Sequence, residues 1–467
     1  MTAATAARGA RAANRDTGLQ YPAQIGTYSG LSPHRSGDLF LHNKAGQASE
    51  TDLMKTPDHR QSEDTPGHQG LLFDLILTGG CRLVLNTARR FAYPFAPALS
   101  RAMGVPLTYI TSMIAVNQAS GLLAMFFGPF ADRLGYRFMM LLGLFMLASG
   151  MLAAAALPLY GIVLLALFLA GLGKNVFDPA IQAYVGERIP YERRGLVIGL
   201  IEISWAASTL IGIPLVGLLI AWQGWRAPFV VMGLAALVGM LLIALRLPPK
   251  ARSIHRRHHR TPALRSAWSR LFHSRRARAM LVVAFLVSMA NDGIFVIYGA
   301  WLEKEFQLSV AQLGFGSSVI GMAELCGEFM TVSLTDRMGK ERALLFGIVL
   351  STVGYLILPW SDASLALALG GLFALFVAVE FTFVTALSMA TEILPDHRAT
   401  MMSGMLAVAG LGRMGGAATG GFLWVWQGAL SVALVSAMLC ATAAAALLAM
   451  EKFSSSKSQT VDPAENT

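Results

Sequence analysis

The sequence predicts an all-α integral membrane protein with twelve transmembrane helices in two pseudo-symmetric six-helix halves. Three observations predict this class: the composition, the number of long apolar stretches, and a repeat that relates the two halves of the chain. Apolar residues make up 55% of the 467 residues, charged residues only 14%, and the mean hydropathy is +0.55. A soluble chain of this length carries far more charge, because its surface must stay hydrated.

Twelve apolar stretches recur along the chain, each near the roughly 20 residues that a helix needs to cross the hydrocarbon core. They span residues 71–99, 107–128, 138–156, 161–185, 195–221, 227–247, 279–302, 310–333, 343–359, 363–390, 399–424 and 429–450. In lipid, only helices and closed barrels pair all backbone groups internally. Barrel strands alternate apolar and polar residues over about ten positions, whereas these stretches are longer and uniformly apolar. Each stretch is therefore expected to be a membrane-spanning helix.

Two short fragments recur at a constant separation along the chain. The tetrapeptide Asp-Arg-Leu-Gly at Asp132 returns as Asp-Arg-Met-Gly at Asp336, and the tripeptide Trp-Gln-Gly at Trp222 returns at Trp426. A shared offset at several sites indicates two copies of one ancestral unit. In a membrane protein, such parallel repeats form two halves that face one another across a substrate pathway. The expected halves are residues 71–247 and 279–452.

Positive charge is concentrated in the connectors that follow the even-numbered stretches. The connectors after the odd-numbered stretches hold only Arg101, Arg226 and Lys304. Because Lys and Arg stay on the cytoplasmic side during insertion, both termini are expected in the cytoplasm, with the bundle in a bacterial inner (plasma) membrane. The formal charge of +10 is thereby explained without nucleic acid as a partner.

The connector between the halves, residues 248–278, contains no Asp or Glu and is rich in Arg. Its apolar residues Leu264, Trp268, Leu271 and Phe272 recur at helical spacing. This pattern predicts a short interfacial helix on the anionic lipid of the cytoplasmic leaflet. A docking site for a partner or a regulatory lipid is the alternative, although a topology signal already explains the charge.

The two ends of the chain differ from the apolar stretches. Residues 1–70 and 453–467 are polar and contain no apolar run long enough for a core, so both are expected to be disordered cytoplasmic segments. The Arg-bearing start is not followed by an apolar segment of a secretory signal.

Cysteine and histidine positions argue against metal and cofactor chemistry. The three cysteines lie far apart in separate stretches, and all nine histidines lie outside the stretches. A disulfide framework, a haem with histidine ligands and an intramembrane metalloprotease are therefore not expected. No glycine-rich phosphate loop is present either. The sequence predicts no metal, no cofactor and no enzyme activity.

The connector after the second stretch carries a motif that identifies a family. It resembles the loop signature of the major facilitator superfamily, whose usual form is Gly-x-x-x-Asp-Arg-x-Gly-Arg-Lys/Arg. The matching residues are Gly128, Asp132, Arg133, Gly135 and Arg137. Tyr136 departs from the signature, since it replaces a basic residue. The second copy keeps Asp336, Arg337 and Gly339 but has Val332 where the first has Gly128. The resemblance covers about residues 70–452 and implies the fold of that superfamily.

The resemblance implies that these loop residues form a latch on the cytoplasmic side. Asp132 can face the positive N-terminus of a neighbouring helix, which the resemblance identifies as the eleventh, beginning near Thr400. Arg133 and Arg137 are then expected to pair with nearby acids. Such contacts hold one side shut and must break when it opens. The alternative is that these residues only end helices and set the topology.

Charged residues within the stretches are distributed unevenly, and the third, sixth, ninth and twelfth stretches have none. A charge near the bilayer centre is costly unless it faces protein or water. The four uncharged helices are therefore expected to face lipid, and the charged ones to surround a central pathway. The resemblance implies the same arrangement, with helices 1, 4, 7 and 10 as gates. Candidates for the substrate or proton pathway are Arg89, Arg90, Lys174, Asp178, Glu202, Asp292, Glu324, Glu328, Glu380 and Arg413.

The embedded bases and acids are close to balanced, so organic anions, amphipathic drugs, sugars and metal complexes all stay open as substrates. Arg89 and Arg90 diverge by about 100° on a helix, so one can bind an anionic substrate group while the other pairs with an acid. Lys174 and Asp178 share a helix face and can neutralise each other.

The embedded acids are candidates for proton coupling. Glu324 and Glu328 place two like charges on one face, which favours holding a proton near neutral pH. Glu324, Asp292 and Glu380 are the proton-coupling candidates, and Arg413 is a possible counter-charge. For each residue, a purely structural ion pair is an equal alternative.

The fifth stretch contains Gly and Pro in the segment 212–217, Gly-Ile-Pro-Leu-Val-Gly, which is similar to part of the signature of proton-coupled efflux members. Close helix packing through small residues is the alternative explanation. The sequence thus predicts a secondary active transporter of a small solute, working by alternating access as a proton antiporter in the export direction. The alternative is a non-transporting sensor or scaffold that acts through the N-terminal extension or the basic loop.

Overall fold

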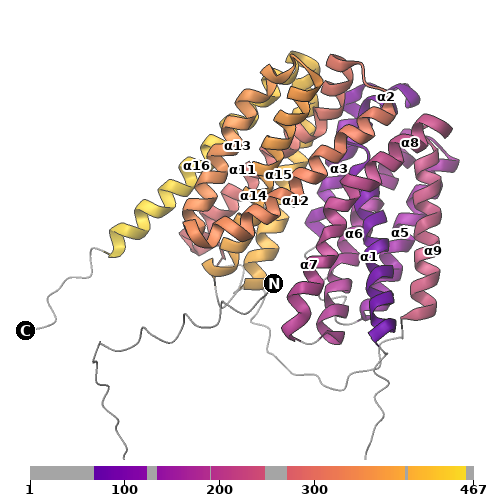
Figure 1. Cartoon of the computed structure of the whole chain (residues 1–467), viewed down its shortest axis with the longest axis horizontal. Coiled ribbons are helices and arrows are strands. Elements are labelled where there is room, and N and C mark those ends of the chain that lie inside the picture. The colour runs from indigo at the N-terminus through magenta and orange to yellow at the C-terminus, as the bar shows by residue number, and fades with distance from the viewer. Residues whose placement is uncertain (1–67, 124–133, 190, 248–270, 395–397, 459–467) are drawn as a thin grey trace, which may run out of the picture. The chain divides into compact units, whose positions relative to one another are not determined.

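The computed structural model describes residues 68–123, 134–189, 191–247, 271–394 and 398–458 (Figure 1). All of them belong to one unit, residues 65–467. This part of the chain folds into helices joined by short connectors, and it contains no strand. Helices occur at all twelve of the expected stretches.

The N-terminal half contains the first six of these stretches, and three of them are broken within their length. Its elements are α1 (His68–Arg90), α2 (Ala96–Met103), α3 (Leu107–Ala119), η1 (Ser120–Leu123), α5 (Tyr136–Ala156), α6 (Tyr160–Arg188), α7 (Tyr191–Ala207), η2 (Ser208–Gly212), α8 (Ile213–Gln223) and α9 (Ala227–Arg246). The first stretch breaks after α1, in a turn that precedes α2. The fifth breaks at the π-helical turn η2, just before Pro214, which cannot donate to the helical ladder.

The C-terminal half contains the other six stretches in longer helices. Its elements are α11 (Arg275–Phe306), α12 (Val310–Met338), α13 (Lys340–Ile357), η3 (Leu358–Ser361), α14 (Leu365–Ile393), α15 (Arg398–Gln427) and α16 (Ala429–Ser458). Within the described residues, eight spans are long and apolar enough by length and composition to cross a membrane. A further pair, α2 with α3 and η1, is bent by 119° where the chain turns between the first two expected spans.

The internal repeat is visible in the backbone as well as in the sequence. Gly135 and Gly339 begin the third and ninth expected helices with φ of 89° and 81°. Gly224 and Gly428 end the fifth and eleventh helices with φ of 85° and 78°. Residues with a side chain rarely adopt this conformation, so the two copies keep glycine at the same two turns.

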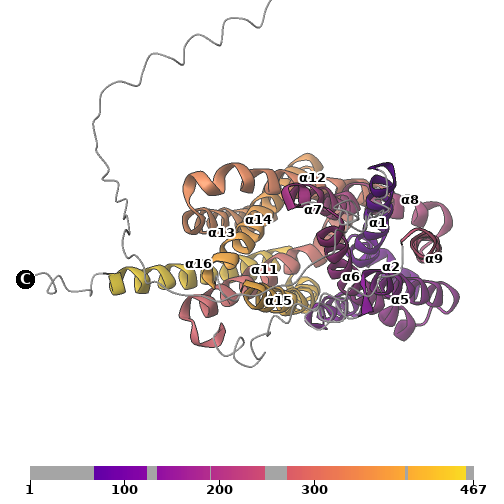
Figure 2. The ribbon, with the colours of Figure 1, turned by 90° about the horizontal axis from the view of Figure 1, so that it is seen from below.

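Helices pack most closely within each half, and the halves also contact one another. In the N-terminal half α5 packs against α6 and α9, and in the C-terminal half α11 packs against α15 and α16. Figure 2 shows the two sets of helices from below, coloured indigo to magenta and orange to yellow. Between the halves, α3 packs against α15, and α8 with η2 packs against α12.

Several contacts between the halves lie toward one end of the bundle. We call this end, where the chain turns at residues 104–106, 224–226 and 307–309, the sealed end. Arg101 of α2 and Glu303 of α11 form an ion pair of 2.5 Å there. On the α8–α12 seam the helices approach so closely that a Cβ on Gly314 would lie 3.2 Å from the Cα of Pro214. Small residues permit this approach, as is usual between membrane helices.

Some expected boundaries shift in the structure. α11 begins at Arg275 rather than at residue 279, and α16 extends to Ser458, past the expected boundary at 452. The N-terminal extension and most of the predicted interfacial helix lie outside the described residues. Of that helix, Leu271 is buried and Phe272 is exposed.

Candidate functional site

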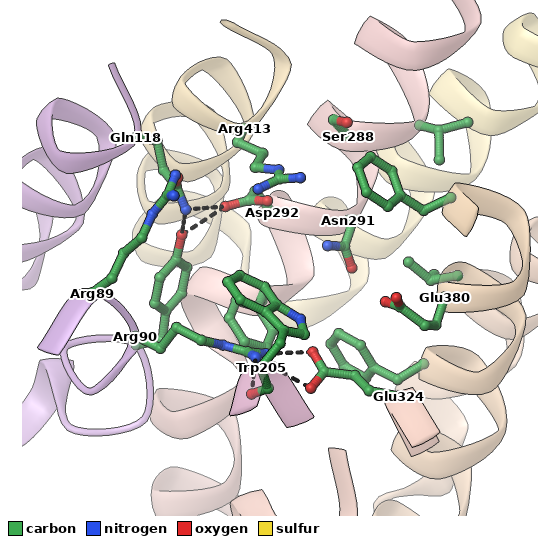
Figure 3. Close-up of a pocket in the computed structure, with 16 residues that line it drawn as sticks. Arg89, Arg90, Gln118, Trp205, Ser288, Asn291, Asp292, Glu324, Glu380 and Arg413 are labelled. Atoms are coloured by element: carbon green, nitrogen blue, oxygen red, sulfur yellow. Dashed lines mark hydrogen bonds and ion pairs between the residues drawn. The ribbon is translucent and has the colours of Figure 1, made fainter. Parts of the chain in front are cut away.

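A cavity of about 100 Å³ lies between the two halves (Figure 3). Side chains from α1, α3 and α7 line it on one side, and side chains from α11, α12, α14 and α15 line it on the other. None of its lining residues comes from α5, α9, α13 or α16, the third, sixth, ninth and twelfth expected helices. The cavity lining agrees with the prediction for these four helices, whereas α6, which carries Lys174 and Asp178, contributes no lining residue.

One ion pair crosses the cavity from half to half. The guanidinium of Arg90 on α1 donates two hydrogen bonds to the carboxylate of Glu324 on α12, at 3.1 and 2.5 Å. Both side chains are buried. Trp205 of α7 stacks on the same guanidinium, 4.3 Å from its ring centroid, and Thr209 donates a hydrogen bond of 3.4 Å to Glu324. A bidentate pair of this kind fixes both partners in one geometry.

Arg89 precedes Arg90 on α1, and no carboxylate among the described residues pairs with it. Its guanidinium donates one hydrogen bond of 2.5 Å to the side-chain amide oxygen of Gln118 on α3, and Asn117 donates to its backbone carbonyl. The Nε atom of Arg89 is buried without a hydrogen-bond partner. Within the described residues, this buried guanidinium forms no ion pair.

Asp292 of α11 lies between the two halves at the same end of the cavity. It accepts hydrogen bonds from the Tyr93 hydroxyl at 2.7 Å and from the Gln118 amide at 3.3 Å. Gln118 also donates to Tyr93, so the three side chains form a closed triangle. Arg413 of α15 lies beside Asp292 in Figure 3 and also faces the ring of Phe383, at 5.2 Å. No ion pair within the described residues involves Arg413.

Glu380 of α14 lines the cavity on the side away from Arg89 (Figure 3). It makes no hydrogen bond or ion pair with the other residues drawn there. The cavity therefore has one end with two guanidiniums and one carboxylate, and another with a single acid and the neutralised Arg90–Glu324 pair.

A second charged cluster, the Arg82 cluster, lies within the N-terminal half and does not line the cavity. Arg82 of α1 pairs with Asp178 of α6 at 2.9 Å and with Glu202 of α7 at 2.8 Å. Lys174 also pairs with Asp178 and lies 5.3 Å from the Trp205 ring centroid. Of the ten pathway candidates, Lys174, Asp178 and Glu202 belong to this cluster. Glu328, half-buried on α12, belongs to neither group.

Comparison with known proteins identifies the family of this chain. The sequence model of the Major Facilitator Superfamily matches residues 79–298 and 280–465. The chain belongs to the major facilitator superfamily.

Individual relatives and a solved structure agree with this assignment. An uncharacterized MFS-type transporter of Bacillus subtilis, YceJ, is 26% identical over 73% of this chain and 86% of its own. A homolog of the multi-drug resistance efflux pump PmrA from Lactococcus lactis is 24% identical, over 62% of this chain and 73% of its own. The structure of a bacterial homolog of the human lysosomal transporter Spinster shares the fold, with a TM-score of 0.65 and 14% identity over 83% of this chain and 96% of that one.

The superfamily loop is described only in part. Gly128, Asp132 and Arg133 lie outside the described residues. Arg137 donates a hydrogen bond of 2.7 Å to the backbone carbonyl of Ala244, not to the acid expected for it. The last carbonyls of α9 have no partner within their own helix, so they are available to a basic side chain.

In the second copy of the loop, Asp336 and Arg337 are exposed at the end of α12. Gly339 follows them and makes the turn into α13. Next to it, Lys340 forms an ion pair of 2.5 Å with Glu392 of α14, which stays within the C-terminal half.

Several cavity residues were not predicted from the sequence: Tyr93, Gln118, Trp205, Ser288 and Asn291. Gln118 and Asn117 are amides within an apolar stretch, and such polar residues in membrane helices usually face protein or water. That signal could have identified Gln118. Tyr93 lies in the turn between α1 and α2, where helical periodicity gives no direction.

Proposed function

We propose that this protein is a secondary active transporter that moves a small solute through the central cavity by alternating access. The observation that carries the proposal is the cavity's position between two repeated halves, with charged side chains from both. A site shared by two halves changes its exposure when the halves move against one another. A site within one half does not.

The seal at one end supports alternating access. The Arg101–Glu303 ion pair and the close α8–α12 seam join the halves at the sealed end. With both termini in the cytoplasm, as the basic connectors favour, this end faces away from the cytoplasm. We propose that the cavity exchanges solute with the cytoplasm in this conformation and with the other side after the contacts at the sealed end separate.

Proton coupling is proposed through the cavity acids Asp292, Glu324 and Glu380. Glu324 has the clearest link to a conformational change, because protonation removes the charge that binds Arg90 in the opposite half. When one member of a buried ion pair loses its charge, the remaining buried charge strongly destabilises that conformation. Protonation of Glu324 is thus expected to release the contact between the halves.

Export is the proposed direction, and a bacterial plasma membrane is the proposed location. The efflux-pump relative and the partial Gly/Pro signature in residues 212–217 support export. Gly217 also packs against α12 at the sealed end, so close packing accounts for part of the signature.

Transport in proteoliposomes tests the proposal. Vesicles loaded with a pH-sensitive dye are given gradients of glucose, benzoate or ethidium, each compared with protein-free vesicles. We expect at least one solute gradient to move protons, Glu324→Gln to abolish that movement, and Glu341→Gln, an exposed acid on α13, to leave it unchanged. Proton-independent movement of a solute contradicts the coupling.

The sensor alternative makes a different prediction. If the protein moves no solute by any route and deletion of residues 1–65 abolishes its cellular phenotype, the transport proposal is wrong.

A further inference from the structure

We infer that the cavity binds a small organic acid, with the carboxylate of the ligand held between Arg89 and Arg413. The inference rests on the proposed transport function and names the class of solute. It is carried by an excess of guanidinium groups at one end of the cavity.

The local charges at that end do not cancel. Arg89 and Arg413 both line the cavity, and Asp292 is the acid that lines it at the same end. One oxygen of Asp292 already accepts from Tyr93 and Gln118. Two guanidiniums beside one carboxylate carry a net charge of about one positive unit, which one further negative charge would balance. A monovalent anion supplies it.

The hydrogen-bonding capacity of Arg89 is also incomplete. The side chain is 7% exposed, donates to the neutral Gln118, and keeps its Nε without a partner. A buried guanidinium without a carboxylate is costly in an apolar environment. The two parallel N–H groups of a guanidinium match the two oxygens of a carboxylate, which makes this the natural ligand group.

A neutral donor lies on the same face of α11 as Asp292. Ser288 lines the cavity one turn before Asp292, is 3% exposed, and its hydroxyl has no hydrogen-bond partner. Asn291 lines the cavity as well. Ser288 and Asp292 are four residues apart and therefore share a helix face.

The rest of the lining is suited to a ligand whose remaining part is flat and apolar. Phe295, Phe376 and Phe383 line the cavity with their rings. Its volume of about 100 Å³ restricts the ligand in this conformation to a small molecule. An aromatic or short aliphatic monocarboxylate satisfies both the charge and the walls.

A cationic solute is the competing class, since Glu380 at the other end forms no ion pair with any residue that the structure describes. A cation in so small a cavity is close to the two guanidiniums, and like charges repel strongly where water is excluded. An amino acid, with its ammonium group toward Glu380, is within the inferred class because it also presents a carboxylate.

Calorimetric titration of the purified protein in detergent at one fixed pH tests the inference. The ligands are benzoate and nicotinate, with the isosteric benzamide and nicotinamide as neutral controls and benzylamine as the cation. We expect an acid to bind at least about tenfold more tightly than its amide, the size of effect that one charged hydrogen bond produces. Arg89→Gln and Arg413→Gln are expected to lower acid affinity by a similar factor. Arg226→Gln, on the surface at the sealed end, is the matched control and leaves it unchanged.

Three outcomes overturn the inference: equal binding of amide and acid, preferential binding of benzylamine, or no binding of either acid to protein that still melts cooperatively. The test is independent of transport. Acids that bind but are not transported contradict the proposed function alone. Transport of another solute without acid binding contradicts this inference alone.

Discussion

Three arginines on α1 lie within three helical turns of one another and have different partners. Arg82 is held by two carboxylates of its own half, Arg90 by one carboxylate of the opposite half, and Arg89 by an amide only. Three arginines on one helix thus differ in their partners: one is fully paired within its half, one bridges the halves, and one has no carboxylate partner among the described residues. The difference separates a group that stabilises one half from a group that joins the halves and a group available to a ligand.

The largest loss of stability is predicted for substitution of Arg82. Arg82→Gln leaves Asp178 and Glu202 without the base that pairs with both, and loss of one partner from a buried ion pair costs about 3–5 kcal/mol. Because Glu202 is partly exposed, we expect the lower end of that range. Thermal melting in detergent measures it, with Arg226→Gln as the control. A melting temperature equal to that of the wild type contradicts a structural role for the Arg82 cluster.

The next largest effect is predicted at the inter-half ion pair. Glu324→Gln removes the charge that holds Arg90, so we expect proton-coupled transport to fall at least about tenfold. The loss of stability is expected to be smaller than in Arg82→Gln, because Arg82 also donates to the Ile201 carbonyl and the Ser204 hydroxyl. The double variant Arg90→Gln/Glu324→Gln is expected to be more stable than Glu324→Gln alone, because no buried charge is left without a partner. If the two single effects on stability simply add in the double variant, the pair does not couple the halves.

Arg89→Gln is expected to change the stability of the ligand-free protein only slightly. The substitution removes a buried charge that has no acid partner, so we expect stability to change by less than about 1 kcal/mol or to rise. The ligand-dependent gain in stability is expected to disappear. Thermal melting with and without benzoate measures both quantities, and a large loss in the absence of ligand would show that Arg89 has a structural partner.

The smallest effect is predicted at the sealed end. The Arg101 side chain is 60% exposed, so its ion pair with Glu303 contributes at most about 1 kcal/mol after solvent screening. Arg101→Gln is expected to leave the melting temperature nearly unchanged and to raise modestly the reactivity of a cysteine that replaces Ser318, which donates to the Leu210 carbonyl across the α12–η2 contact. No change in reactivity at all would leave the α8–α12 packing alone responsible for the seal.

The sequence predicted the architecture because its signals are local or repeated. Span length, the positions of charged residues and the separation of the Asp132 and Asp336 motifs were enough for two halves and a charged interior. Within the site, periodicity showed that Arg89 and Arg90 must point in different directions. It could not show that Glu324 is the partner of Arg90, because that depends on how α12 packs against α1.

The remaining site residues depend on tertiary packing. Lys174 and Asp178 were expected near the pathway, but the turn of α6 that carries them faces Arg82 within the N-terminal half. Tyr93 and Trp205 enter the cavity from positions where the helices break or are about to break. Pro214 marks the break that follows Trp205. Which side chains a break directs into the cavity depends on packing against neighbouring helices, so helical spacing alone does not identify them.

The melting temperatures of Arg82→Gln, Arg90→Gln and Arg89→Gln, each with and without benzoate, test most directly whether the three arginines have different roles. We predict the greatest destabilisation for Arg82→Gln, an intermediate value for Arg90→Gln, and a value near the wild type for Arg89→Gln. Benzoate is expected to stabilise the wild type and not Arg89→Gln. Equal destabilisation of all three variants, with the benzoate effect retained in Arg89→Gln, would contradict the division of these arginines into structural, bridging and ligand-binding groups.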